Sequence, residues 1–230
     1  MTNLQWRGVF PALTTKFTGR DEIDWAAMER HLEFQLDAGV HGLVILGSLG
    51  ETSTLRHAEK LEMVKFFSRM DRKGRPLLAC IAESSTRDAK EFALAAEQAG
   101  AEGFMLLPPM RYPSDRRETM IFLHEVASAT SLPIMLYNNP VAYGIDICPD
   151  DIASLADNPK FQAVKESSMD TRRIPEIRKR LGDRMAIFCG VDDLALECLA
   201  LGAVGWVAGL VDAFPHETVQ LWKLTQANRT

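Results

Sequence analysis

The sequence has few cysteines, and none of them pair at close spacing. Its four cysteines, at positions 80, 148, 189 and 198, lie far apart and form no C-x-x-C motif. Such spacing is typical of buried free thiols in a reducing compartment, and it argues against both a disulfide framework and a zinc site. We therefore expect a cytoplasmic protein.

Long apolar runs and basic blocks are also absent. No apolar run approaches the ~20 residues that a membrane-spanning helix needs, and the N-terminal residues lack the apolar core of a signal peptide. The chain has 26 Lys and Arg against 31 Asp and Glu, for a net charge of -5. This balance, without a basic cluster, predicts neither nucleic acid nor a membrane as a partner.

Motifs for metal binding and acyl transfer are missing as well. The five histidines, at positions 31, 41, 57, 124 and 216, form no H-E-x-x-H motif and no other pair at metal-ligand spacing. The sequence contains no G-x-S-x-G motif, and no Cys/His pair suggests an acyl-transfer triad. We expect no metal and no cofactor.

What the sequence does contain is a regular alternation of short apolar runs and amphipathic segments. Continuous apolar runs are typical of strands buried on both faces of a parallel sheet. They predict strands at residues 8–15, 42–47, 76–82, 103–107, 133–137, 161–165, 185–189 and 204–208. The amphipathic segments predict helices at residues 25–37, 58–69, 89–98, 115–129, 150–156, 172–180, 193–200 and 215–226.

Eight strand–helix units fit a (β/α)8 TIM barrel better than an open doubly wound sheet. The composition is that of an ordinary globular protein, with 47% hydrophobic and 25% charged residues, and no linker divides the chain. At three unit boundaries Gly39, Gly100 and Gly202 end a helix in a pattern that fits a left-handed cap. We expect one barrel domain over residues 1–230, with its functional residues at the carboxyl ends of the strands.

Lys165 is the most informative residue at those strand ends. It closes the apolar run 161–165, so its stem is expected in the barrel interior with its amine at the mouth. Because a buried ammonium is costly, burial favours the neutral, nucleophilic amine, which can form a Schiff base with a carbonyl substrate. The alternative is a structural lysine at the end of a strand, paired with Glu166.

Tyr137 ends the neighbouring strand, where a phenol beside an amine can move protons during Schiff-base chemistry. The alternative is a tyrosine at the edge of the core with a solvated hydroxyl. The glycine pair Gly47 and Gly50 frames a loop whose backbone N–H groups can hold an anion, although a plain tight turn explains it equally well. Asp192 and Asp193 can accept hydrogen bonds from substrate, or can cap the following helix.

These residues lie in motifs that resemble those of the dihydrodipicolinate synthase / N-acetylneuraminate lyase family. The loop Gly47-Ser48-Leu49-Gly50-Glu51 is similar to its G-[ST]-x-G-E motif, Tyr137-Asn138-Asn139-Pro140 to its Y-N-x-P motif, and Val164-Lys165-Glu166-Ser167 to its strand-6 lysine motif. The order and spacing agree, and the resemblance extends from about Trp6 to Trp222. It implies a metal-free class I lyase that forms a Schiff base with pyruvate or a related 2-keto acid, and that works as a homo-oligomer, a dimer or a tetramer.

The resemblance also implies roles for individual residues. Lys165 matches the Schiff-base lysine, Tyr137 the proton-shuttling tyrosine, and Ser48 the hydroxyl that bonds that tyrosine. The backbone at Ser48 and Leu49 matches the site for the 2-keto carboxylate. Together with the other strand-end residues, this gives a set of expected substrate-binding positions: Gly47, Leu49, Asn139, Ser167, Gly190, Asp192, Asp193 and Gly209.

Three departures from the family pattern bear on the substrate. Ala142 stands where the synthases carry an arginine for the second substrate's carboxylate, and Leu49 stands where they carry a threonine. Met110 takes the place of a tyrosine that reaches across a subunit interface, with Tyr112 close by. A planar carboxylate is best bound by a bidentate arginine, which alanine cannot replace.

We therefore expect the branch that handles sugar-acid or hydroxyproline breakdown products. The first candidate is a 1-pyrroline-4-hydroxy-2-carboxylate deaminase, followed by a keto-deoxy sugar-acid dehydratase or aldolase. The alternatives are a 4-hydroxy-tetrahydrodipicolinate synthase that condenses pyruvate with aspartate semialdehyde, a non-catalytic keto-acid-binding barrel, and a phosphate-binding barrel isomerase, which the acidic loop at 192–193 disfavours. We also expect the small C-terminal helical subdomain of the family to be absent from this chain.

Overall fold

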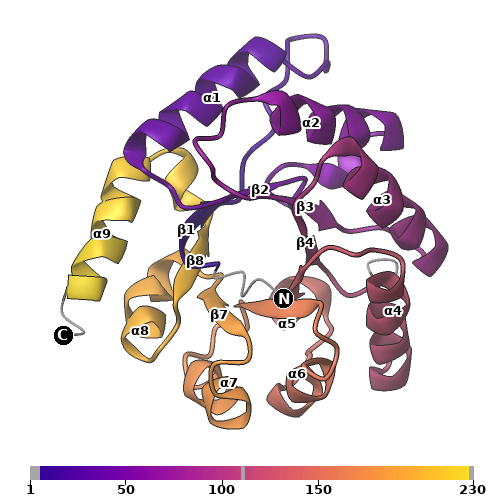
Figure 1. Ribbon diagram of the computed structural model, residues 1–230, viewed down its shortest axis with the longest axis vertical. Coiled ribbons are helices and arrows are strands. Elements are labelled where there is room, and N and C mark those ends of the chain that lie inside the picture. The colour runs from indigo at the N-terminus through magenta and orange to yellow at the C-terminus, as the bar shows by residue number, and fades with distance from the viewer. Residues whose placement is uncertain (1–5, 110–111, 228–230) are drawn as a thin grey trace.

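The eight predicted strands form one parallel sheet in the computed structural model, which describes residues 6–109 and 112–227 (Figure 1). The strands are β1 (Gly8–Pro11), β2 (Leu43–Ile45), β3 (Leu77–Ile81), β4 (Gly103–Leu106), β5 (Ile134–Asn138), β6 (Phe161–Glu166), β7 (Ala186–Cys189) and β8 (Gly205–Ala208). Their order is β1-β8-β7-β6-β5-β4-β3-β2. The predicted (β/α)8 TIM barrel is thus confirmed.

The barrel closes between its first two strands through a short contact. Ala12 and Val44 form an isolated parallel bridge, and the Leu13 N–H donates to the Val44 carbonyl at 2.9 Å. Strand β1 was expected to run to residue 15, but it ends at Pro11, since only this bridge continues the pairing. The residues that follow are therefore free to leave the barrel wall at the mouth.

Helices surround the sheet, as Figure 1 shows in a view down the barrel. They are α1 (Trp25–Ala38), α2 (His57–Arg69), α3 (Thr86–Ala99), α4 (Arg116–Ser128), α5 (Pro140–Tyr143), α6 (Pro149–Leu155), α7 (Arg173–Leu181), α8 (Ala195–Ala200) and α9 (Pro215–Ala227). Every predicted helix is present, and α3 begins earlier than predicted because Ser85 caps it through a hydrogen bond from the Asp88 N–H. Gly39 and Gly100 end their helices with φ values of 86° and 105°, which are left-handed caps as predicted.

Several short elements at the mouth of the barrel were not predicted from the sequence. These are helix α5 and the 3-10 turns η1 (Thr52–Thr54) and η3 (Leu210–Asp212), whereas the turn η2 (Asp192–Leu194) overlaps the start of the helix predicted at 193–200. Each is too brief to show an apolar period. In the described part of the chain, no helix has both the length and the apolar character to cross a bilayer.

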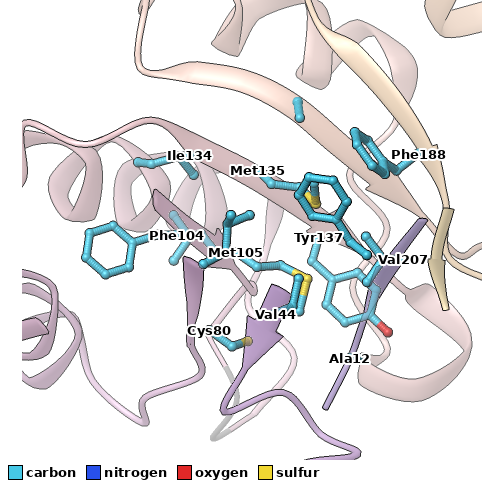
Figure 2. Close-up of a cluster of buried hydrophobic side chains, with 14 of the residues drawn as sticks. Ala12, Val44, Cys80, Phe104, Met105, Ile134, Met135, Tyr137, Phe188 and Val207 are labelled. Carbon is cyan, nitrogen blue, oxygen red and sulfur yellow. The ribbon is translucent and has the colours of Figure 1, made fainter. Parts of the chain in front are cut away.

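The barrel interior is filled by alternate residues of the strands. Figure 2 shows a cluster of buried side chains on both faces of the sheet, among them Tyr137 from β5, Phe188 from β7 and Val207 from β8. Tyr137 is in register with Lys165 on β6, and Lys165 is in register with Phe188 on β7. The fold therefore places the tyrosine and the lysine side by side at the carboxyl ends of adjacent strands.

Candidate active site

Lys165 lies inside the barrel with its amine against an aromatic ring. The residue is 6% exposed, and its Nζ atom lies 4.0 Å from the centroid of the Tyr137 ring. Among residues 6–109 and 112–227, no carboxylate forms an ion pair with it. The buried stem agrees with the expected place of Lys165 near the carboxyl end of β6, and its role there stays a prediction.

Glu166 does not pair with this lysine, because side chains alternate along a strand and Glu166 points to the other face. Its carboxylate accepts hydrogen bonds from the Asn138 Nδ2 at 3.1 Å and from the Ser168 N–H at 2.7 Å. Burial raises the pKa of Glu166, although these donors and the nearby Arg173 oppose the shift. The alternative of a lysine held by Glu166 is therefore wrong.

Gly190 makes room for the stem of Lys165. A Cβ atom at Gly190 would lie 2.7 Å from the lysine Cε and 2.8 Å from its Cγ, and it would also collide with the Ser167 hydroxyl. The Ser167 side chain is buried, and its hydroxyl has no hydrogen-bond partner in the part of the chain described. Ser167 and Gly190, both expected at the site, thus lie against the lysine.

Tyr137 is held by groups that favour its ionised form. Burial alone would raise its pKa, but the positive charge of Lys165 and hydrogen bonds from Asn139, Lys165 and Tyr143 hold the pKa below its ordinary value. The Asn139 Nδ2 donates to the Tyr137 hydroxyl at 3.0 Å. Asn139, predicted as a substrate-binding residue, therefore contacts the tyrosine directly.

The expected contact between Ser48 and Tyr137 is not made. The Ser48 hydroxyl instead lies 2.5 Å from the hydroxyl of Tyr143, whose ring meets that of Tyr137 edge to face at 5.7 Å. The reason is helix α5, whose last residue is Tyr143 and so carries this side chain in between. Sequence reasoning missed Tyr143. The local signal was Asn139-Pro140 at a helix start with Gly144 just after it.

The loop with Gly47 and Gly50 has the compact form that was expected. A Cβ atom at Gly50 would lie 2.9 Å from the Leu13 carbonyl oxygen, so only glycine fits there. The backbone N–H groups of Ser48 and Leu49 donate to no acceptor among the described residues. The side chains of Ser48 and Leu49 are exposed. Leu49 packs against Gly209, because a Cβ atom at Gly209 would lie 2.7 Å from the Leu49 Cδ1.

Asp192 is engaged by the protein itself. Its carboxylate accepts hydrogen bonds from the Trp206 Nε1 at 3.0 Å, the Gly209 N–H at 3.1 Å and the Leu210 N–H at 2.8 Å. These contacts tie the loop after β7 to the loop after β8, so the expectation of Asp192 as a free acceptor for substrate is corrected. Asp193 is exposed, and neither aspartate caps the following helix through its side chain.

Of Met110 and Tyr112, only Tyr112 belongs to the described residues. Met110 lies outside the described residues. Tyr112 is 63% exposed, and the described contacts of Ser48 and Tyr137 include none to it. In the described ranges, no three side chains of His, Cys, Asp or Glu lie close enough to share a metal ion.

Comparison with known proteins agrees with this geometry. The family model described as "Dihydrodipicolinate synthetase family" matches residues 5–230. The chain belongs to this family. Relatives named 4-hydroxy-tetrahydrodipicolinate synthase include those of Exiguobacterium sibiricum, 34% identical over 97% of this chain and 76% of the relative, and of Methanospirillum hungatei, 33% identical over 96% and 77%.

Solved structures of the family superpose closely. The 4-hydroxy-tetrahydrodipicolinate synthase of Methylacidiphilum fumariolicum is 30% identical with a TM-score of 0.94, covering 98% of this chain and 75% of that one. YagE of E. coli K12, a family member solved in complex with pyruvate, is 27% identical with a TM-score of 0.91, covering 97% of this chain and 76% of that one. The chain thus spans about three quarters of these relatives, and its described part ends with α9.

Proposed function

We propose that the protein is a Schiff-base-forming lyase in which Lys165 attacks a short 2-keto acid and Tyr137 transfers protons. The observation that carries this proposal is the buried amine of Lys165, 4.0 Å from the Tyr137 ring and in no ion pair with a described carboxylate. A positioned amine next to a proton donor is what imine formation requires.

The surroundings of the lysine supply groups that suit such a substrate. The N–H groups of Ser48 and Leu49 donate to no described acceptor, which supports their proposed use for the carboxylate, since backbone amides form anion sites in other proteins. The unpartnered Ser167 hydroxyl lies against Gly190, beside the lysine stem. It is available to a keto or hydroxyl oxygen of the bound molecule.

The experiment is borohydride trapping. We expect incubation with pyruvate and borohydride to add one reduced pyruvate to the protein, and peptide mass spectrometry to place it on Lys165. Phosphate esters at the same concentration serve as a competition control, because they would protect only a phosphate-binding barrel. An adduct on another residue, or none with any 2-keto acid, would refute the assignment.

Two substrate classes are in question. The names of the relatives favour a 4-hydroxy-tetrahydrodipicolinate synthase, for which the partner of pyruvate is aspartate semialdehyde. Ala142, exposed on α5, favours the branch without a distal carboxylate, with 1-pyrroline-4-hydroxy-2-carboxylate or a keto-deoxy sugar acid as substrate. The occupied Asp192 weakens this second reading, because it removes one of the two acceptors expected for hydroxyl groups.

A substrate panel separates these classes. The panel compares pyruvate plus aspartate semialdehyde with 1-pyrroline-4-hydroxy-2-carboxylate, keto-deoxy sugar acids and N-acetylneuraminate. The change Ala142→Arg is the matched variant, because it restores the one guanidinium that the synthase pattern has and this chain lacks. If the wild type prefers aspartate semialdehyde, Ala142 carries no weight and the synthase is correct. Keto-acid binding without turnover or imine would identify a non-catalytic barrel.

We also propose that the enzyme works as a homo-oligomer in the cytoplasm. All four cysteines are free thiols in the structure, which suits a reducing compartment. The oligomeric state follows from the family resemblance alone. Sedimentation of the purified protein tests it, and a monomer at micromolar concentration would contradict it.

A further inference from the structure

Three hydroxyl groups form a line from the lysine to the mouth of the barrel. Tyr137 lies beside Lys165, the ring of Tyr143 meets the ring of Tyr137 at 5.7 Å and 87°, and the Tyr143 hydroxyl lies 2.5 Å from the Ser48 hydroxyl. Tyr137 is buried, Tyr143 is partly buried and Ser48 is exposed. The line therefore leads from the interior to solvent within one chain.

Helix α5 holds the middle of this line in place through one residue. The Asn139 Oδ1 accepts a hydrogen bond from the Ala142 N–H at 3.1 Å and so caps the helix, while its Nδ2 donates to the Tyr137 hydroxyl. At the other end Gly144 has a left-handed φ of 70°, and its N–H donates to the Pro140 carbonyl. Both tyrosines are thus fixed relative to each other by Asn139.

We infer that Tyr143 is a relay residue that carries protons between Tyr137 and Ser48, which makes the proton path complete within a single chain. This inference rests on the proposed Schiff-base function. It assigns to a residue of α5 the place for which the resemblance expected a tyrosine from a partner subunit, where this chain has Met110.

The relay has a defined task in imine formation. The neutral nitrogen of Lys165 adds to the keto carbon, the C=O π electrons move to the oxygen, and one N–H proton passes to that oxygen to give a neutral carbinolamine. The carbon–oxygen bond then breaks while the nitrogen lone pair forms the C=N bond, and the leaving hydroxyl takes the proton of Tyr137 and departs as water. The Tyr137 phenolate takes a proton from Tyr143, Tyr143 takes one from Ser48, and Ser48 takes one from solvent. One solvent proton is consumed, and the iminium carries the positive charge.

The surroundings of the two phenols decide which of them ionises first. Burial, together with the neighbouring Tyr137, raises the pKa of Tyr143, while Lys165 and the hydrogen bonds lower that of Tyr137. Tyr143 therefore keeps its proton when Tyr137 has lost its own. The other titratable group facing this pair is Cys80 on β3, and burial raises its pKa to about 12, so it stays neutral.

The test compares Tyr143→Phe with Tyr112→Phe. These variants remove the same hydroxyl group, and Tyr112 is the exposed tyrosine nearest in sequence to Met110. We expect Tyr143→Phe to slow the formation of the borohydride-trapped pyruvate adduct roughly 10- to 100-fold, less than a direct general acid contributes. Tyr112→Phe should leave the rate unchanged. An unchanged rate in Tyr143→Phe, or a loss in Tyr112→Phe alone, would overturn the relay.

A second measurement does not depend on any substrate. The chain has three tyrosines, so an ultraviolet titration of phenolate can be assigned with single Phe variants. Removing the Tyr143 hydroxyl takes a hydrogen bond from the Tyr137 phenolate, and the pKa of Tyr137 should therefore rise. A purely structural Tyr143 would leave the titration of Tyr137 in place, which would refute the inference. Failure of the wild type to form any adduct would instead refute the proposed function, and this titration would still decide the coupling.

Discussion

Two lysines are buried to the same extent in this barrel, but different groups surround their amines. Lys60 on α2 and Lys165 on β6 are each 6% exposed. The amine of Lys60 lies 2.7 Å from the Glu83 carboxylate, whereas that of Lys165 lies against the ring of Tyr137. A buried charge with a partner is a structural element, and a buried amine beside a phenol is poised for chemistry. The surroundings of the two lysines, rather than their burial, separate these roles.

The largest expected effect comes from removing the unpaired lysine. Lys165→Met should abolish the pyruvate adduct and turnover, because no other amine lies at this place. It should leave the free energy of unfolding nearly unchanged, since no carboxylate loses a partner. Trapping and urea denaturation measure the two effects. A variant that loses several kcal/mol of stability would show that Lys165 is structural as well.

Tyr137 provides the next test of the chemical side. Tyr137→Phe keeps the ring against Lys165 but removes the proton donor, and a positioned acid–base group contributes ~10²–10⁴-fold. We therefore expect kcat to fall by about this factor and KM to change much less. Steady-state kinetics with the preferred substrate of the panel measure both. Weaker binding with unchanged kcat would make Tyr137 a binding residue instead.

The paired lysine should behave in the opposite way. Lys60→Met leaves the Glu83 carboxylate without its partner in a site where its side chain is only 16% exposed. Breaking such a pair costs about 3 kcal/mol, while the adduct at Lys165 should still form. The double variant Lys60→Met with Glu83→Gln serves as the control and should recover part of the stability. Equal loss of the adduct in Lys60→Met and Lys165→Met would contradict the assignment of a structural role to Lys60 and a chemical role to Lys165.

The smallest expected effect on stability comes from an ion pair at the surface, between Arg72 and Glu102. Hydrogen bonds from Arg72 lower the pKa of Glu102, against the opposing effect of partial burial, and the Leu77 N–H adds to the shift. A lowered folded-state pKa stabilises above the unfolded value, and this stabilisation is lost as the pH falls through the folded value. Glu102→Gln should therefore cost less than about 1 kcal/mol at pH 7. Thermal melts should show the difference vanish in acid, and a constant difference would exclude the carboxylate as its cause.

The sequence predicts the frame of this protein far better than its contacts. All eight strands and the place of Lys165 follow from short apolar runs, because burial on both faces leaves a local pattern. Tyr143 was missed because α5 has only 4 residues, too few for a period. Its contact with Ser48 joins residues 95 positions apart, and only the closed barrel brings them together.

Two acidic residues also show that the sequence predicts positions better than contacts. Asp192 and Glu83 each follow a strand, where polar residues suggest a site. In the structure, Asp192 accepts hydrogen bonds from the backbone of the loop after β8, and Glu83 accepts one from Lys60 on α2. Neither partner is marked in the local sequence, because a carboxylate at a strand end looks alike whether it binds substrate or backbone.

Gly190 has a consequence for how fast Lys165 can react. A lysine side chain that is free to rotate loses up to ~2 kcal/mol of conformational entropy when it is held in one rotamer. Here the absent side chain of Gly190 leaves a slot that the Cγ and Cε of Lys165 fill. Folding has already imposed that ordering before any substrate arrives. The amine therefore meets the keto carbon as a preorganised group, and a larger share of the binding energy of the substrate remains available to lower the barrier to attack.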